Sequence, residues 1–209
     1  MTRGKFITIE GQDGAGKTTN ADVVKSYLKA ARIPFVHSRE PGGTVLGESI
    51  RDLILSSGDK RIGDKAELLL MFAARAQHIQ DVIEPALARG DWVLCDRFTD
   101  ATYAYQGGGR GMPMSHIAEL EGYVQGSLRP DLTVLLDLPV ELGERRAGQR
   151  SVPDRFEQQQ LNFKQGVRDC YLARASAEPN RIKVIDASQT IDAVSCAINA
   201  VMEAFVYNG

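Results

Sequence analysis

The stretch "KFITIEGQDGAGKTT", residues 5–19, decides how the rest of the chain is interpreted. Its apolar first half predicts a buried strand that ends directly at Gly11. Gly16, Lys17 and Thr18 follow after four intervening residues, which is the spacing of a phosphate-binding loop. Glycines here let the chain turn so that successive backbone N–H groups point at phosphate oxygens. The stretch therefore predicts a strand, a phosphate-binding loop and a helix that begins near Lys17.

The predicted loop indicates that the chain binds a nucleoside triphosphate. Lys17 is expected to reach the β- and γ-phosphates, and the Thr18 hydroxyl is expected to ligate Mg²⁺. The first turn of the following helix adds the positive end of the helix dipole. The expected nucleotide-binding residues of the loop are Gly11, Gln12, Asp13, Gly14, Ala15, Gly16, Lys17, Thr18 and Thr19.

Strand-like and helical segments alternate along the rest of the chain. Further β-branched or apolar runs lie at 34–39, 92–96, 132–138 and 182–186, and helical patterns lie between and after them. This alternation predicts an α/β fold in which a five-stranded parallel sheet has helices on both faces. Ligands of such sheets bind at the carboxyl ends of the strands. The expected helices span 18–31, 44–55, 64–90, 114–127, 139–149, 156–177 and 190–206.

Length and composition exclude several classes of function. The 209 residues fit one domain, and a net charge of −2 with a pI near 6.0 gives no general attraction to nucleic acid or membrane. The sequence begins with a predicted strand and has no signal-like or membrane-spanning apolar run. Three widely spaced cysteines indicate a reducing compartment without a disulfide framework or zinc site. We expect a cytoplasmic protein.

Arginines follow several of the predicted strands. Arg39 begins "REPGGT" after the second strand, Arg97 follows Asp96 after the third, and "RRAGQRSVPDR" (145–155) follows the fourth after one helix. An arginine fork matches phosphate oxygens in pairs, so these residues predict a second anion site beside the nucleotide. A nucleotide-dependent switch has no use for a second anion site, and the sequence lacks the "NKxD" segment that reads guanine. The pattern therefore favours a kinase.

Five segments together carry a family resemblance. "GQDGAGKTT", "REPGGT", "FAARAQ", "DRFTDATYAYQGGGRG" and "RRAGQRSVPDR" resemble bacterial thymidylate kinases in order and spacing over nearly the whole chain. The resemblance implies the nucleoside monophosphate kinase fold with its phosphate-binding loop. It also implies transfer of a phosphoryl group from ATP to dTMP with Mg²⁺, and a homodimer packed through helices.

The resemblance also implies a role for individual residues. Asp13 is expected to bind the 3′-hydroxyl of the acceptor sugar and help order the water around the metal. Thr18 and Asp96 are the expected Mg²⁺ ligands. Lys17, Arg97, Asp13 and a lid arginine are the expected catalytic residues. The expected dTMP-binding residues are Asp13, Arg39, Arg51, Met71, Phe72, Arg75, Arg97, Thr102, Tyr105 and Gln106.

One position departs from the usual pattern of the family, and another is one at which its members differ. The aromatic residue that stacks on thymine usually lies four residues before Arg75, where this chain has Met71, and Phe72 is the next residue. Met71 is favoured as the base contact because its polarizable sulfur can cover a ring, and Phe72 is the alternative. Some relatives also carry an arginine where this chain has Gly14.

The missing loop arginine implies that another arginine supplies charge to the transferring group. Glycine and proline interrupt the helical pattern over about 145–156, which predicts a mobile lid within the single domain 1–209. Arg150 is the expected catalytic arginine, Arg155 the second candidate and Arg146 a helper at ATP.

The nearest alternative is a deoxynucleoside kinase, which shares the fold but phosphorylates a neutral hydroxyl group. That reaction needs a carboxylate base near the acceptor and no phosphate clamp. Arg39 and Arg97 favour a monophosphate as the acceptor.

Overall fold

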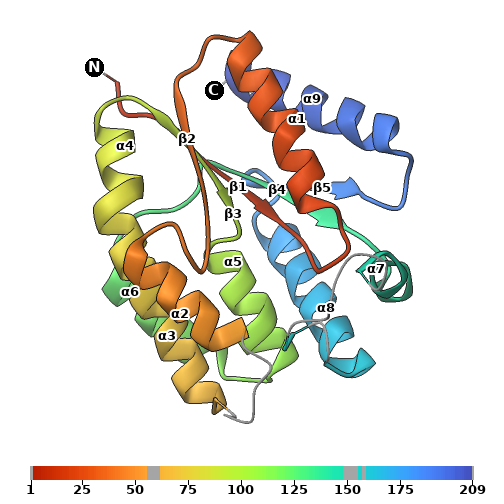
Figure 1. Ribbon diagram of the computed structural model, residues 1–209. Helices are drawn as coiled ribbons and strands as arrows, with labels where there is room; N and C mark the ends of the chain where they lie inside the picture. Colours follow the sequence, from red (N-terminus) through yellow and green to blue (C-terminus); the bar gives the residue numbers. More distant parts are fainter. Residues whose placement is uncertain (1, 56–61, 148–154, 157–158, 209) are drawn as a thin grey trace.

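Five short strands form one parallel sheet in the order β2-β3-β1-β4-β5 (Figure 1). The computed structural model describes residues 2–55, 62–147, 155–156 and 159–208. Within them, each predicted strand is confirmed to within one residue at either end, and the predicted α/β class is confirmed. The strands are β1 (Phe6–Glu10), β2 (Phe35–Arg39), β3 (Trp92–Asp96), β4 (Leu132–Asp137) and β5 (Ile182–Asp186).

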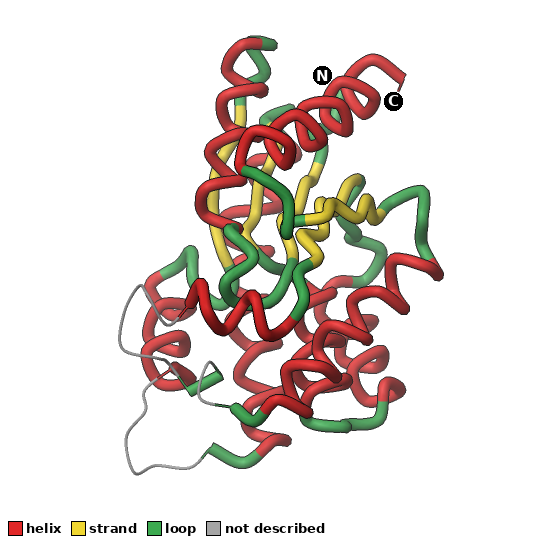
Figure 2. The backbone as a smooth tube through the Cα atoms, turned by 90° about the vertical axis from the view of Figure 1, so that its right-hand side faces the viewer, coloured by secondary structure: helices red, strands yellow, loops and turns green. Residues whose placement is uncertain are grey.

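Helices cover both faces of the sheet, and a largely helical region lies beyond it in the lower part of Figure 2. The α-helices of the described residues are α1 (Lys17–Ala30), α2 (Val45–Leu55), α3 (Asp64–His78), α4 (Glu84–Ala88), α5 (Thr99–Thr102), α6 (Met114–Gln125), α7 (Val140–Ala147), α8 (Leu161–Ala177) and α9 (Ile191–Asn208). Two π-helical segments, η1 (Ile79–Ile83) and η2 (Tyr103–Gly109), continue α3 and α5.

Alternation along β1 explains why both faces are covered. Ile7 and Ile9 are fully buried in a core that also contains Val24 of α1 and Ile198 of α9. Phe6 points to the opposite face, where it packs among residues of η1, α4 and the segment after β3. Strands that are apolar on both faces belong in the middle of such a three-layered fold. This packing fixes the carboxyl ends of β1, β2 and β3 side by side.

The predicted helix over 64–90 is confirmed as a continuous helical run to Ala88, but its second half contains a π-helical turn that the sequence did not predict. The chain is α-helical as far as His78, then π-helical over η1, and α4 ends at Ala88. Pro85 lies at the start of α4 and has no N–H to donate to the turn before it. The wider turn of η1 accommodates this loss without ending the run.

The predicted helix over 156–177 begins later, at Leu161. Phe156 instead lies in a turn, where its ring is buried against those of Tyr105 and Phe163 at centroid distances of 5.5 and 6.5 Å. Gln160 is extended and precedes the first turn of α8. Burial of an aromatic ring in the core therefore fixes the chain before the helix begins.

The segment η2, "YAYQGGG", is helical although three consecutive glycines disfavour a helix. Gly108 lies against the backbone of Gly166 in α8, and a Cβ atom at Gly108 would overlap the Gly166 carbonyl. The glycines therefore permit close contact between η2 and α8, and this contact carries Tyr105 and Gln106 to the site described below.

Candidate functional site

The phosphate-binding loop lies between β1 and α1, as the sequence predicts. Lys17 is largely buried, and its Nζ donates to the carbonyls of Gly11 and Gln12, each at 3.1 Å. Gln12 in turn donates to the carbonyl of Leu138, directly after β4, which ties the loop to the sheet. Burial, followed by the positive charge of Arg97, lowers the pKa of Lys17. The loop thus concentrates positive charge at the start of α1.

Gly14 cannot be replaced by an arginine without rearranging the loop. Its φ is +80°, and a Cβ atom there would overlap the backbone of Gly143 in α7. Close contact with α7 therefore leaves no room for a side chain, and the loop itself supplies no guanidinium group.

Asp13, Arg97 and Tyr105 form a cluster beside Lys17. Arg97 Nη2 lies 2.6 Å from Asp13 Oδ1 and its Nη1 donates to the Gly11 carbonyl at 2.9 Å. The Tyr105 hydroxyl donates to Asp13 Oδ2 at 3.2 Å, and the Arg97 guanidinium lies 4.8 Å from the centre of the Tyr105 ring. Burial opposes ionisation of Asp13, but Arg97 and Lys17 outweigh it and lower its pKa. The φ of Arg97 is +66°, a strained conformation for a residue with a side chain.

A cavity of about 300 Å³ opens beside this cluster at the carboxyl ends of β1, β2 and β3. It has a charged side, at the loop and its arginines, and an apolar side that includes Leu55, Met71 and Phe156. The predicted site residues on its wall are Asp13, Gly14, Gly16, Lys17, Thr18, Arg39, Arg51, Met71, Arg75, Asp96, Arg97, Thr102, Tyr105 and Gln106.

Arg75 lies on the cavity wall with most of its guanidinium already bound. Its Nε donates to Glu40 Oε2 at 2.8 Å and its Nη2 donates to the Thr102 hydroxyl at 2.9 Å. His78 holds the other oxygen of Glu40 at 2.9 Å. Arg75 Nη1 is buried and has no hydrogen-bond partner among the residues that the structure describes. A buried donor without a partner is rare in folded proteins, so this nitrogen is a candidate ligand contact.

Met71 and Phe72 lie in different environments. Met71 lines the cavity, whereas Phe72 is buried with Leu68, Tyr103 and Ile117 and does not line it. Adjacent residues of a helix point about 100° apart, so only one of the two side chains can face the ligand. The expectation that Phe72 contacts the base is therefore not supported, and Met71 remains the candidate.

Arg39 and Arg51 lie at the mouth of the cavity. Arg39 is half exposed and pairs with Glu48 at 2.8 Å, and Arg51 Nη1 donates to the Pro41 carbonyl at 3.0 Å. Burial, followed by the charge of Arg39, lowers the pKa of Arg51. Two neighbouring guanidinium groups make this end of the cavity attractive to an anion.

Asp96 and Thr18 lie together on the cavity wall. Asp96 Oδ1 is buried and no described residue donates a hydrogen bond to it, so a metal ion or its bound water fits this oxygen. No group of three or more carboxylate, histidine or cysteine ligands occurs among the described residues. Mg²⁺ in nucleotide sites commonly uses one or two protein ligands and completes its shell with phosphate and water, so the pair is sufficient.

The lid arginines are only partly described. Arg146 Nη1 donates to the Ala187 carbonyl after β5 at 2.8 Å, and Arg150 lies outside the described residues, as does most of the predicted lid. Arg155 Nη2 lies 2.8 Å from Glu67, an ion pair that the sequence did not predict.

Of the remaining residues of the phosphate-binding loop, Ala15 is buried in the core and Thr19 is exposed.

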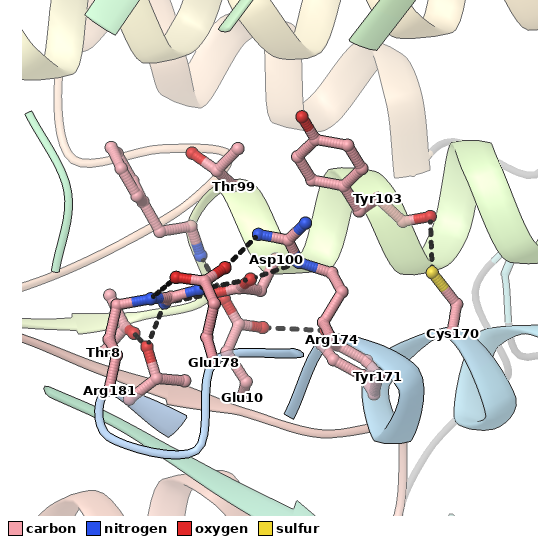
Figure 3. A network of polar contacts seen from close by, with 12 residues as sticks. Thr8, Glu10, Thr99, Asp100, Tyr103, Cys170, Tyr171, Arg174, Glu178 and Arg181 are labelled. Carbon is pink, nitrogen blue, oxygen red and sulfur yellow. Dashed lines mark hydrogen bonds and ion pairs between the residues drawn. The ribbon is translucent and has the colours of Figure 1, made fainter. Parts of the chain in front are cut away.

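Sequence reasoning missed a buried network behind the cavity (Figure 3). Glu10, at the end of β1, accepts from the Tyr171 hydroxyl and the Phe98 N–H, each at 2.7 Å. Asp100 accepts from Arg174 at 2.5 Å and from Arg181 at 2.7 Å. Tyr171 and Arg174 come from α8, Arg181 directly precedes β5 and Phe98 follows β3. Only the position of Glu10 directly before the loop could have drawn attention to it.

We expect Glu10 to make the stability of the protein depend on pH. Burial, followed by the charge of Asp100, raises its pKa from 4.5 to about 8, so the native state holds more protons than the unfolded chain between these values. The stabilisation is complete below about pH 4.5 and is lost as the pH rises to about 8. The free energy of unfolding should fall by at most about 5 kcal/mol, at about 1.4 kcal/mol per pH unit.

Urea unfolding of the wild type and of Glu10→Gln at about pH 5 and about pH 8 measures this effect. The variant cannot ionise, so it should lose much less stability between the two conditions. Equal losses in the two proteins would show that Glu10 is not the titrating group.

Comparisons with known proteins relate the sequence to one family. A family model described as "Thymidylate kinase" matches residues 9–198. A thymidylate kinase of Pseudomonas syringae pv. syringae is 54% identical over 199 residues, covering 95% of each chain. One of Methylococcus capsulatus is 56% identical over 198 residues, covering 95% of this chain and 94% of the relative.

A solved structure shows the same fold. The crystal structure of thymidylate kinase from Ehrlichia chaffeensis is 33% identical, with a TM-score of 0.78 over 96% of this chain and 99% of that one. The glycine-rich loop, the arginines and the cavity thus occur in a chain whose sequence matches one family over almost all of its length. The chain belongs to the thymidylate kinase family.

Proposed function

We propose that the cavity is where this chain transfers the γ-phosphoryl group of ATP to dTMP. Thymidylate kinases are nucleoside monophosphate kinases, which use ATP and typically Mg²⁺, and this chain is such an enzyme. A phosphate oxygen of dTMP attacks the γ-phosphorus, the bond to the β-phosphate oxygen breaks, and ADP leaves. The protein contributes by holding two anions in line and by stabilising the charge of the transition state.

The thymine ring is placed between Met71 and the polar group of Arg75, Thr102 and Gln106. This placement rests mainly on Arg75 Nη1, which has no partner among the described residues. The other two nitrogens of the guanidinium, Nε and Nη2, are already bonded to Glu40 and Thr102. A donor fixed in this way suits the O4 carbonyl of thymine. Met71 supplies an apolar surface for the ring.

Two dTMP analogues test this placement in the wild-type enzyme. One has a 2-pyrimidinone base, which lacks O4, and the other has a 4-pyrimidinone base, which lacks O2; both also lack the hydrogen on N3, so that loss is matched. A lost hydrogen bond to a charged donor is typically worth about 1.5–3 kcal/mol, so kcat/KM for the analogue without O4 should lie about 10- to 100-fold below that for the analogue without O2. Equal losses for the two analogues would contradict the assignment to Arg75.

The sugar and the acceptor phosphate are placed on the charged side of the cavity. Asp13 is the acceptor for the 3′-hydroxyl, and Tyr105 packs where a ribose 2′-hydroxyl would project. Arg39, Arg51 and Arg97 hold the phosphate. Support comes from the hydrogen bond that links Tyr105 to Asp13 and from the three guanidinium groups on one wall.

ATP is placed on the loop from Gly11 to Thr19, with Lys17 at its β- and γ-phosphates. Thr18 and Asp96 are the residues that would hold Mg²⁺, and the unpartnered Asp96 oxygen supports this choice. The metal, when bound, neutralises charge on the phosphates. Arg146 lies beside the segment after β5, which is the proposed border of the adenine site.

Arg150 is the proposed catalytic arginine, in a lid that spans about 145–156 of a single domain 1–209. The crowding at Gly14 supports this, since the loop cannot carry an arginine. The contact between Arg155 and Glu67 also favours Arg150 over Arg155.

A cytoplasmic homodimer is the proposed state of the enzyme. Helices α2, α3 and α6 pack together and expose Val45, Leu69 and Tyr123, which supports an interface there. Within the described residues, no helix has the length and apolar character needed to cross a membrane.

A further inference from the structure

Glu67 of α3 is fully buried and lies behind the cavity wall. Its Oε1 accepts a hydrogen bond from Gln106 Nε2 at 2.9 Å. Its Oε2 lies 3.2 Å from Arg110 Nη2 and 2.8 Å from Arg155 Nη2. Glu67 is thus the common partner of two arginines and of one amide that lines the cavity.

These contacts fix which end of the Gln106 amide faces Glu67. A carboxylate between two guanidinium groups only accepts hydrogen bonds, and an amide donates only from its NH₂ end. The NH₂ group must therefore point to Glu67, and the amide oxygen is the end that remains for the cavity. The backbone of Gln106 is held as well, because its carbonyl accepts from the Met112 N–H at 3.1 Å.

We propose that Glu67 is a positioning residue that sets base specificity by holding the oxygen of the Gln106 amide toward the base. The inference rests on the proposed placement of the base against Gln106. Thymine carries a hydrogen on N3, so it can donate to this oxygen. Cytosine has a lone pair on N3, so it would place two acceptors face to face in a buried site.

This contribution is separate from that of Arg75, which reads the group at position 4 of the base. An acceptor placed against another acceptor typically costs about 10-fold or more in specificity. Glu67 therefore accounts for part of the preference for dTMP over dCMP and leaves the remainder to Arg75.

Glu67→Gln is the variant that tests the proposal. Its amide can donate or accept, so Gln106 is free to present either end to the base. The ratio of kcat/KM for dTMP to that for dCMP should fall about 10-fold. The ratio for dTMP to dUMP should stay within about 2-fold, because both bases carry a hydrogen on N3.

Glu121→Gln is the matched control. Glu121 is also buried and accepts from the Tyr103 hydroxyl at 2.6 Å and from Arg129 at 2.8 Å, but neither of these partners lines the cavity, whereas Gln106 does. Neither ratio should change in this variant. If Glu67→Gln fails to fold, the double variant Glu67→Gln with Arg110→Gln removes one charge of each sign and should show the same loss of preference.

Gln106→Met separates this inference from the proposed site. If it leaves the preference for dTMP over dCMP unchanged, the base does not contact Gln106, and the placement of the base is wrong. If Gln106→Met lowers the preference and the Glu67 variants keep the wild-type ratio, the site stands and the role of Glu67 is overturned.

Discussion

Replacing Lys17 with alanine should lower kcat about 10³-fold and leave the protein folded. Nζ of Lys17 lies at the centre of the loop, 3.1 Å from two backbone carbonyls, at the beginning of α1. In the proposed complex, its ammonium group faces the transferring phosphoryl group. Negative charge spreads over that group in the transition state, so the loss should appear mainly in kcat.

A coupled assay of ADP release gives kcat and KM for both substrates, and thermal unfolding checks the fold. Lys25→Ala is the control, because Lys25 lies on the same helix and pairs only with Asp22 at 2.5 Å among the described residues. We expect its kcat to match the wild type. A wild-type kcat in Lys17→Ala would show that Lys17 is not a catalytic residue.

The sheet and the loop could be predicted from the sequence because their signals are local. Each strand is a short apolar run that ends in a polar turn. The glycines between residues 11 and 16 are spaced so that the backbone N–H groups can turn toward a phosphate. The carboxyl ends of parallel strands meet at one edge, so Arg39, Asp96 and Arg97 could also be placed together. The structure has all three on one cavity.

Features that depend on packing could not be predicted in the same way. The choice between Met71 and Phe72 depends on how α3 is rotated against its neighbours, and a helical pattern that is apolar nearly all round leaves this rotation open. Arg155 is assigned to the lid from the composition of the residues around it. Its actual partner, Glu67, lies far away in the sequence, so local composition could not predict this contact. The same is true of Glu10 and Tyr171.

Arg97→Ala should lower kcat/KM for dTMP about 10³-fold, and Arg97→Lys about 10²-fold. The guanidinium donates to the Gly11 carbonyl at 2.9 Å and to Asp13 at 2.6 Å, with a longer contact of 3.4 Å to the Tyr171 hydroxyl. An ammonium group keeps the charge but cannot form this fork, and it interacts less well with the face of Tyr105. The proposed clamp on the acceptor phosphate and the position of Asp13 are therefore both affected.

Comparison of Arg97→Ala with Arg97→Lys separates the effect of the positive charge from that of the hydrogen-bonding geometry of the guanidinium. Asp13 Oδ1 also lies 3.7 Å from Lys17 Nζ, so an Asp13 released by Arg97 can pair with Lys17 and neutralise it. Neutralisation of Lys17 would slow phosphoryl transfer from ATP, so kcat would fall even at saturating dTMP. The KM for dTMP would rise as well. Arg89→Ala, an exposed arginine paired with Asp91, is the control and should behave as the wild type.

A loss confined to the KM for dTMP would show that Arg97 binds only the acceptor phosphate and that Asp13 keeps its position without it. Near-wild-type values in Arg97→Lys would show that one positive charge is sufficient and that the fork has no role. The strained φ of +66° favours the opposite result. A conformation that costs about 1–3 kcal/mol persists where the surrounding contacts hold it, and here those contacts end on the loop and on Asp13.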